Sequence, residues 1–267
     1  MSEYVQLSYF DIALASVFLL LNGVLSLWLR LGIARSLAFA MVRMVVQLLL
    51  VGMLLKSLFA IQSPWLTLLV ALFMASFAAR EIWARQERRL KGWRGLAIGG
   101  SAMAASVGMV ALVALIVLVQ PAPWWSPRYA LPLLGMIMGN AMTGISLSLD
   151  TLHTALNREQ RAIEAQLILG ANKWRAMRPF LRQAMRAGMM PSINGMAAVG
   201  VVSLPGMMTG QILSGVDPNE AVKYQLLVMF LIAGATGLAV VLATLGSAKA
   251  LSDDRDRLRL DRLRKHR

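Results

Sequence analysis

Residues 225–245 read QLLVMFLIAGATGLAVVLATL and contain no charged side chain. A helix needs about 20 apolar residues to cross a hydrocarbon core about 30 Å thick, so this stretch is long enough to span a membrane. Similar apolar stretches predict further spanning helices at residues 10–29, 37–55, 65–79, 96–119, 129–149 and 189–213. The sequence therefore predicts an all-α polytopic membrane bundle of about seven helices, of which residues 65–79 form the shortest.

The composition supports a membrane protein and argues against a soluble one. Apolar residues make up 58% of the 267 positions and charged residues 15%, compared with about 25% in a typical soluble domain. A net charge of +14 on a soluble fold would suggest nucleic-acid binding, but here the charges fall between apolar stretches. We therefore expect membrane lipids as a partner and no nucleic acid. With no cysteine, the chain cannot form a disulfide or a thiolate metal site.

The positions of Lys and Arg predict the orientation. An odd number of spans places the termini on opposite sides, and Lys and Arg collect on the inner side of a membrane. With the N-terminus outside, most of the 27 Lys and Arg residues fall inside, whereas Lys56, Arg128 and Lys223 fall outside and Arg43 lies within a span. We predict an inner-membrane protein with the N-terminus outside and the C-terminus inside. Residues 1–248 form its transmembrane domain and residues 249–267 a basic cytoplasmic tail.

The longest inner connection contains a helical hairpin, which we place at residues 157–186. Residues 159–186 read EQRAIEAQLILGANKWRAMRPFLRQAMR, in which Gly170 and Asn172 indicate a helix end and a turn. The predicted apolar face consists of Ile163, Leu167 and Leu169 before the turn and Trp174, Met177, Phe180 and Leu181 after it. Two interpretations remain: the hairpin lies on the anionic lipid surface, or it is a docking element for a soluble partner.

Part of this hairpin resembles a known family. Glu164-Ala165-Gln166, followed by three residues and Gly170, resembles the EAA loop with which ABC-transporter permeases contact their ATP-binding subunit. The wider segment 164–215, including SLPGMMTGQI at 203–212, resembles the FetB family, whose members include a bacterial iron exporter and plant proteins linked to aluminium tolerance. The departures are Gln166, which replaces the third residue of the EAA pattern, and Arg182-Gln183, where many importers place Leu-Pro.

The resemblance implies a permease subunit of an ATP-driven ABC transporter that exports metal ions, with iron first. It further implies a permease homodimer and assigns the coupling role to Glu164, Ala165 and Gly170. The chain has no GxxxxGK[ST] phosphate loop, so we expect no enzymatic activity of its own. ATP and Mg²⁺ are then bound by a separate ATPase subunit, and this chain holds no cofactor.

The predicted sixth span contains an interruption. Pro205 predicts a kink or break there, and carbonyls freed within a membrane must face a cavity or find a donor. The candidate translocation residues in this segment are Ser203, Pro205, Met207, Met208, Thr209 and Gln211, of which the two Met sulfurs suit some transition metals. The alternative is a Pro-kinked helix in which the Met residues only pack. The sequence assigns no metal ligand with certainty.

Two further polar groups lie at or near membrane depth. Arg43 lies roughly 9 Å into its predicted span, and Gln47 follows one turn later on the same face. A charge at this depth indicates a role in the pathway, unless the guanidinium snorkels to the inner interface. Asp150 and His153 could begin a metal site, but helix-end capping and interfacial solvation is the preferred interpretation.

A stand-alone secondary transporter of a small solute or ion is the alternative function. Such a protein should show paired broken helices in two halves, whereas the strong Pro/Gly break occurs once here.

Two smaller predictions concern packing. Asn140 is expected to hydrogen-bond between helices, and the cluster of Met136, Met138 and Met142 is expected to pack rather than to bind metal.

Overall fold

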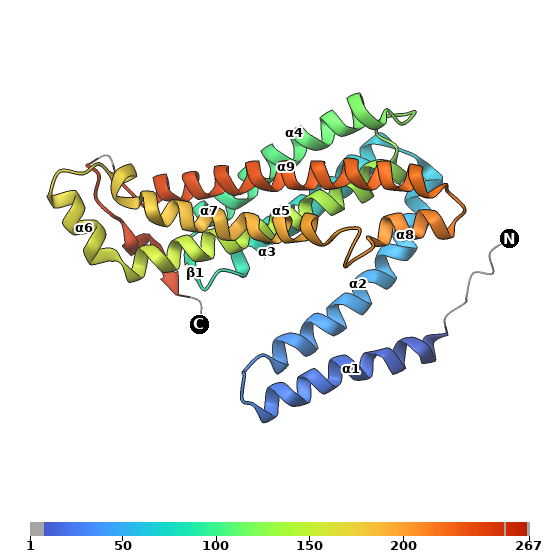
Figure 1. The fold of residues 1–267 in the computed structure, drawn as a ribbon, viewed down its shortest axis with the longest axis horizontal. Coiled ribbons are helices and arrows are strands. Elements are labelled where there is room, and N and C mark those ends of the chain that lie inside the picture. The colour runs from blue at the N-terminus through green and yellow to red at the C-terminus, as the bar shows by residue number, and fades with distance from the viewer. Residues whose placement is uncertain (1–7, 254, 266–267) are drawn as a thin grey trace. The chain divides into compact units, whose positions relative to one another are not determined.

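The computed structural model describes residues 8–253 and 255–265 (Figure 1). The elements in chain order are α1 (Tyr9–Trp28), α2 (Ala34–Ile61), α3 (Pro64–Ala84), β1 (Arg88–Leu90), α4 (Trp93–Val113), the π-helical turn η1 (Ala114–Val119), α5 (Pro127–Arg158), α6 (Gln160–Ile168), α7 (Lys173–Ala198), α8 (Gly206–Leu213), α9 (Pro218–Ala250), the 3₁₀ turn η2 (Leu260–Arg262) and β2 (Leu263–Lys265). The predicted all-α polytopic class is confirmed.

Six helices within the described residues are long and apolar enough to cross a membrane. They correspond to six of the seven predicted spans, including the short third one, which is extended by the structure to Pro64–Ala84. The remaining predicted span, 189–213, is not one continuous helix. Its first part is the end of α7, its last part is α8, and residues 199–205 between them are not helical.

The chain divides into two compact units, which we describe separately. The first contains α1, α2 and the short segment Leu213–Gly215. A capping box starts α1, since Ser8 Oγ accepts from Asp11 N at 3.3 Å and Asp11 Oδ2 accepts from Ser8 N at 2.8 Å. Most apolar side chains of both helices are exposed, as expected of helices that face lipid.

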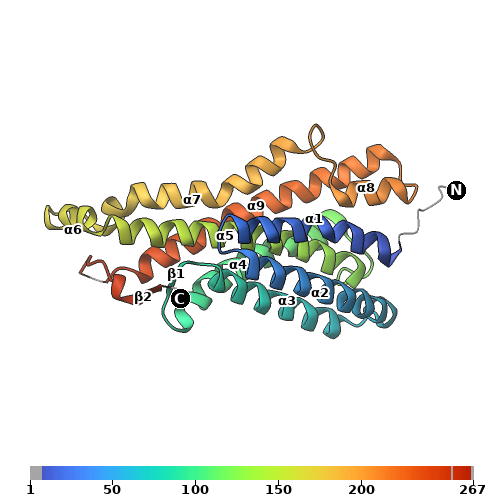
Figure 2. The ribbon, with the colours of Figure 1, turned by 90° about the horizontal axis from the view of Figure 1, so that it is seen from below.

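The second unit contains α3 to α9 apart from the segment Leu213–Gly215. Its core lies where α3, α4, α5 and α9 meet around α5, and α7 packs beside α5 and α9 (Figure 2). The backbones of α5 and α7 approach closely at two glycines: a Cβ on Gly188 would lie 2.6 Å from the carbonyl oxygen of Gly144. Small residues that permit such contact are typical of helix packing in membranes.

The long helices of this unit extend beyond a membrane's hydrocarbon core. A 33-residue helix such as α9 is about 50 Å long, compared with a core about 30 Å thick. The ends of α5 and α9 meet in one second cluster of buried side chains, together with α6, the start of α7 and the tail after Leu251. Because α5 and α9 end at the same place, the segment between them must return to the opposite end of the bundle, and it does so through α7, the break and α8.

Candidate functional site

The turn of the predicted hairpin has a defined backbone geometry. Helix α6 ends in a Schellman motif, in which Ala171 N donates to Gln166 O at 3.0 Å and Gly170 N donates to Leu167 O at 3.0 Å. Gly170 has φ +89°, a conformation that residues with a side chain rarely adopt. Asn172 then begins α7, since its Oδ1 accepts from Arg175 N at 2.8 Å. A rigid turn therefore joins two helices, as the sequence predicted.

The hairpin buries its apolar face against its own chain. Ile163 and Met177 are each 1% exposed, and they pack in the cluster formed by the ends of α5 and α9. Because Ile163 and Met177 are buried against the rest of the chain, they are not available to insert into a lipid surface. Three large apolar side chains of the hairpin are exposed: Ile168 and Leu169 at the tip, at 86% each, and Trp174 at the start of α7, at 41%.

Leu169 was placed on the same apolar face as Ile163 and Leu167, and Ile168 was not singled out. The structure separates Leu169 from the buried Ile163, because regular helix ends at Ile168 and the left-handed Gly170 turns the chain before the helical spacing can continue. Both Ile168 and Leu169 are exposed at the end of the hairpin instead. A helix-end signal directly after two large apolar residues is the feature of the sequence that could have indicated this.

The residues of the EAA-like pattern lie on α6 just before this tip. Glu164 is half-buried, and its Oε1 accepts a hydrogen bond from Gln160 Nε2 at 2.8 Å. Ala165 and Gly170 are exposed. The three predicted coupling residues thus lie in one short segment that is exposed at Ala165 and Gly170 and half-buried at Glu164.

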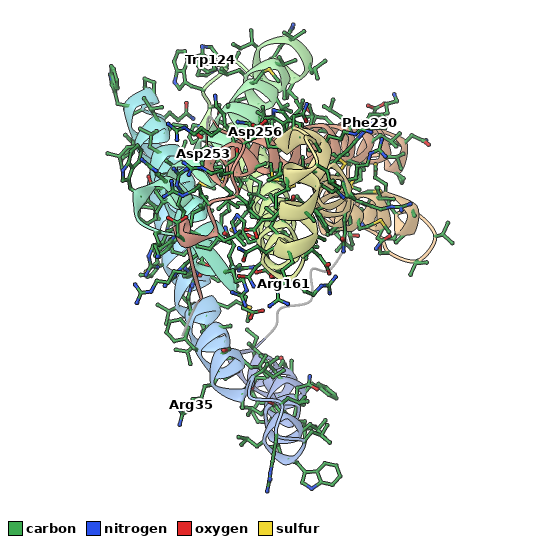
Figure 3. All side chains as sticks on the ribbon, turned by 90° about the vertical axis from the view of Figure 1, so that its left-hand side faces the viewer. Arg35, Trp124, Arg161, Phe230, Asp253 and Asp256 are labelled. Carbon is green, nitrogen blue, oxygen red and sulfur yellow. The ribbon has the colours of Figure 1, made fainter. Side chains whose placement is uncertain are left out.

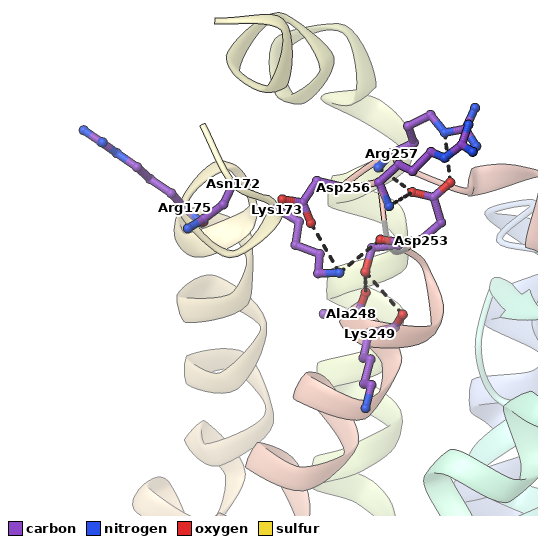
Figure 4. Close-up of polar contacts among 10 residues, drawn as sticks. Asn172, Lys173, Arg175, Ala248, Lys249, Asp253, Asp256 and Arg257 are labelled. Atoms are coloured by element: carbon purple, nitrogen blue, oxygen red, sulfur yellow. Dashed lines mark hydrogen bonds and ion pairs between the residues drawn. The ribbon is translucent and has the colours of Figure 1, made fainter. Parts of the chain in front are cut away.

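The tail holds the hairpin in place, which the sequence did not indicate. Lys173 Nζ, at the start of α7, donates to Asp253 O at 3.0 Å and forms an ion pair with the Asp256 carboxylate at 3.3 Å (Figure 4). The backbone N–H of Arg257 donates to the Asp253 carboxylate and lowers the pKa of that group. Figure 3 views the molecule from the end that holds α6 and the tail, with Arg161 of α6 and these two aspartates labelled.

A short sheet joins the tail to the connection between α3 and α4. Strand β2 pairs antiparallel with β1, with Leu90 opposite Leu263. Both leucines are buried in the cluster that also holds Ile163 and Met177. The tail therefore fastens two connections, the β1 segment and the hairpin, to the ends of the long helices.

For His153 and Asp150, the prediction of helix-end capping and interfacial solvation is corrected in part. His153 is fully buried rather than solvated: its Nδ1 lies 2.7 Å from Arg88 O and its Nε2 2.7 Å from Ser247 Oγ. Asp150 Oδ1 accepts from Glu87 N at 2.7 Å. The pair thus holds β1 against α5 and α9. Among the described residues, no group of three His, Asp or Glu side chains is arranged to hold a metal ion.

The interruption predicted around Pro205 is confirmed as a full break. Helix α7 ends at Ala198, and the chain turns at Gly200, whose φ is +86° and whose N–H donates to Ser203 O at 3.0 Å. Pro205 directly precedes α8, and its carbonyl accepts from Thr209 N at 3.0 Å and from Thr209 Oγ1 at 3.1 Å. The Thr209 hydroxyl is therefore occupied within its own helix.

One cavity adjoins the break, and a second adjoins α8. The first, about 270 Å³, lies among α5, the end of α7 and α9, and its polar lining includes Ser203, Asn140 and Ser192. Asn140 donates to Met136 O on its own helix at 2.8 Å, so the prediction of an interhelical bond was wrong. Ser192 was not predicted. Pro205 also lines this cavity, at the point where the chain enters α8.

The second cavity, about 240 Å³, brings together two methionines from different parts of the sequence. Met207 of α8 lines it together with Met136 of α5, beside Tyr129 and Tyr224. Met138 is buried and Met136 and Met142 pack against the core, in agreement with the predicted packing role. Met208 and Gln211 are half-buried on α8, and Gln211 Oε1 has no hydrogen-bond partner among the described residues.

Arg43 and Gln47 belong to the other unit, on α2. Arg43 is half-buried and Gln47 is exposed. Their assignment to a translocation pathway stays a prediction.

These features define an all-α polytopic membrane protein with a braced hairpin and a broken helix. The chain belongs to the family described as Uncharacterised protein family (UPF0014), which matches residues 9–251. It is 32% identical over 255 residues to the probable iron export permease protein FetB of Escherichia coli strain K12, with 96% of each chain covered.

Two other relatives cover somewhat less of the chain. The UPF0014 membrane protein slr1647 of Synechocystis is 40% identical over 220 residues, which cover 81% of this chain and 83% of the relative. The UPF0014 membrane protein STAR2 of Oryza sativa subsp. japonica is 33% identical over 220 residues, with coverages of 82% and 75%. No solved structure matches the chain. The predicted resemblance to the FetB family is confirmed.

Proposed function

We propose that this chain is the membrane-spanning permease subunit of an ATP-driven ABC transporter that exports metal ions, iron most directly. The similarity to the FetB permease supports the cargo and the direction of transport. The chain carries no phosphate loop, so the ATP and Mg²⁺ belong to a separate ATPase subunit. A homodimer of the permease would present two hairpins to two nucleotide sites.

The observation that carries this proposal is the exposed apolar tip of a hairpin that is otherwise fixed. Ile168 and Leu169 expose large apolar side chains beside Glu164 and Ala165, whereas Ile163 and Met177 anchor the same hairpin in the bundle. Large apolar side chains that lie in pockets of a partner supply much of the energy of protein interfaces. A docked ATPase could move this tip and transmit the movement directly into α5, α7 and α9.

The break between α7 and α8 supplies the candidate pathway. Backbone that is not helical is tolerated at membrane depth where it is buried in protein or lines a cavity, and Ser203 and Pro205 line one here. Met207 adds a thioether to a second cavity. We propose that metal ions pass along this broken element. The assignment of Arg43 and Gln47 of α2 to a pathway is a separate proposal about the other unit.

The orientation is tested by labelling single cysteines on this naturally cysteine-free chain. With the N-terminus outside, a membrane-impermeant maleimide should label Gln120→Cys on intact cells and should label Arg255→Cys only after permeabilisation. The reason is the concentration of Lys and Arg at the end of the bundle that holds the hairpin and tail. Labelling of Arg255→Cys from outside intact cells would contradict the proposed orientation.

Transport measured with the reconstituted protein distinguishes an ATP-driven transporter from a stand-alone secondary transporter. The candidate partner is an ATPase subunit, to be sought among the reading frames next to that of this chain. Liposomes containing both subunits should move Fe²⁺ only when ATP is supplied on the side of the hairpin, and liposomes containing this chain alone should not move it. Fe²⁺ movement by the chain alone, driven by an ion gradient, would establish the secondary transporter instead.

A further inference from the structure

A basic groove lies beside the β1–β2 sheet, outside both the coupling tip and the broken helix. It is lined by Trp83 at the end of α3, by residues 89–92, and by Arg264 of β2, and it encloses about 470 Å³. Among the described residues, the lining contains three cationic side chains and no carboxylate. Such a cavity favours an anionic ligand.

Two of the three cations in this groove are held in place by uncharged groups. The Arg89 guanidinium lies over the Trp83 ring, 4.0 Å from its centroid, and Arg89 Nε is buried with no hydrogen-bond partner among the described residues. Lys91 Nζ donates to the carbonyl oxygen of Asp261 at 2.6 Å, which leaves its charge uncompensated. The Asp261 carboxylate itself is engaged by Arg259, with two N–O distances of 2.9 Å.

The start of α4 adds to the positive potential. Gly92, which lines the groove, is the N-cap of this helix and offers no side-chain cap, and the first turn of α4 contains no acidic residue. The free N–H groups and the helix dipole therefore favour a negative charge near Gly92. The backbone of α4 also lies close to the Trp83 side chain here, since a Cβ on Gly95 would lie 2.8 Å from Trp83 Cδ1.

The position of the groove indicates which anion it binds. It lies where α3 ends and α4 begins, which is the boundary of two helices that can cross the membrane. Trp93 is 78% exposed and Leu96 is 41% exposed on α4, directly next to the groove. Exposed Trp at the end of an apolar helix is typical of the headgroup region. A phosphate held here would have apolar protein surface beside it for attached acyl chains.

We infer that this groove binds the phosphate of an anionic phospholipid from the inner leaflet, with Arg89, Lys91 and Arg264 as its cationic contacts. Two of these residues lie in or next to β1 and the third lies on β2. A bound lipid would therefore join the tail to the α3–α4 connection, and through Leu90 and Leu263 it would support the cluster on which the coupling hairpin packs.

The test measures lipid retention by the purified full chain. Phosphatidylglycerol is titrated into the protein in neutral detergent, with phosphatidylcholine as the comparison lipid, and bound lipid is counted by native mass spectrometry. A basic residue near an anionic lipid contributes about fivefold in affinity, so Arg264→Gln should weaken phosphatidylglycerol binding about fivefold and Arg89→Gln/Arg264→Gln about 25-fold. Phosphatidylcholine should bind weakly and equally to all variants.

Two controls make the result specific. Arg80→Gln/Arg175→Gln removes the same charge from exposed positions outside the groove, and it should leave phosphatidylglycerol binding unchanged. Arg264 is itself exposed, so the single Arg264→Gln variant keeps the test valid if loss of the Arg89–Trp83 contact impairs folding. Equal phosphatidylglycerol binding by wild type and Arg264→Gln would overturn the proposal. Complete displacement by equimolar inorganic phosphate would overturn the lipid as the source of the anion.

Discussion

The double substitution Ile168→Asp/Leu169→Asp is expected to prevent the ATPase subunit from co-purifying with this chain. Each side chain is 86% exposed, so a partner that covers the tip would bury both. Removal of a central apolar contact at an interface costs about 2 kcal/mol or more, on the order of 30-fold in affinity for each residue. A carboxylate buried without a partner adds a further cost. The complex should therefore fall below detection.

The fold of the chain should survive this change, because both side chains already face water. The matched control is Arg161→Asp on the same helix, which is exposed and changes the net charge by the same amount without removing apolar surface. Comparable loss of ATPase from the control would assign the effect to charge. Normal co-purification of the ATPase with the double variant would remove the tip from the proposed interface.

Two further substitutions, one in the turn and one on α6, test the same interface. Gly170→Val forces a β-branched residue to φ +89°, which costs roughly 1–3 kcal/mol and displaces the tip. Glu164→Lys reverses the charge of the predicted contact and also removes the bond from Gln160. Both variants should reach normal abundance in the membrane, because both positions lie outside the candidate spans, and both should retain less ATPase than wild type.

The second large effect concerns the bundle itself: Gly188→Val is expected to prevent α7 from packing against α5. A Cβ at this position would lie 2.6 Å from Gly144 O and 2.8 Å from Ser148 Cβ, and a backbone oxygen cannot move away as the end of a side chain can. Overpacking of this kind costs on the order of 3 kcal/mol, roughly a 100-fold shift toward unfolded protein. Folded protein after detergent extraction should fall accordingly.

Gly195→Val is the matched control for this prediction. It places the same side chain on the same helix, at a position where a Cβ meets no atom within 4 Å. Its yield and thermal unfolding temperature should therefore stay close to those of the wild type. Equal stability of the Gly188→Val and Gly195→Val variants would mean that α5 and α7 are not as close as described.

Hydropathy and turn chemistry predicted the parts of this fold that depend on neighbours in the sequence. Six spans follow from uninterrupted apolar stretches, and the left-handed turn at Gly170 follows from a glycine after an amphipathic helix. The predicted sixth span, 189–213, is not one helix; its break was predicted from Pro205 and not from hydropathy, because an average over apolar residues does not detect a break. Gly200 and Pro205 supply that break.

The long-range contacts that hold β1 and the hairpin in place could not be predicted from the sequence in this way. His153 meets groups 65 and 94 positions away in the sequence, and one of them is a backbone carbonyl that any residue could provide. Lys173 likewise binds a carbonyl of the tail. The exposed tip was missed for a local reason, since helical spacing was continued one residue past the end of α6.

The most direct test of the central claim is the rate of ATP hydrolysis by the partner ATPase in lipid. The rate is measured without this chain, with the wild type, and with Ile168→Asp/Leu169→Asp. We expect the wild type to raise hydrolysis in a manner that depends on Fe²⁺, and the double variant to give the rate of the ATPase alone. An identical rate in all three samples would contradict the account of this chain as a permease driven through its hairpin.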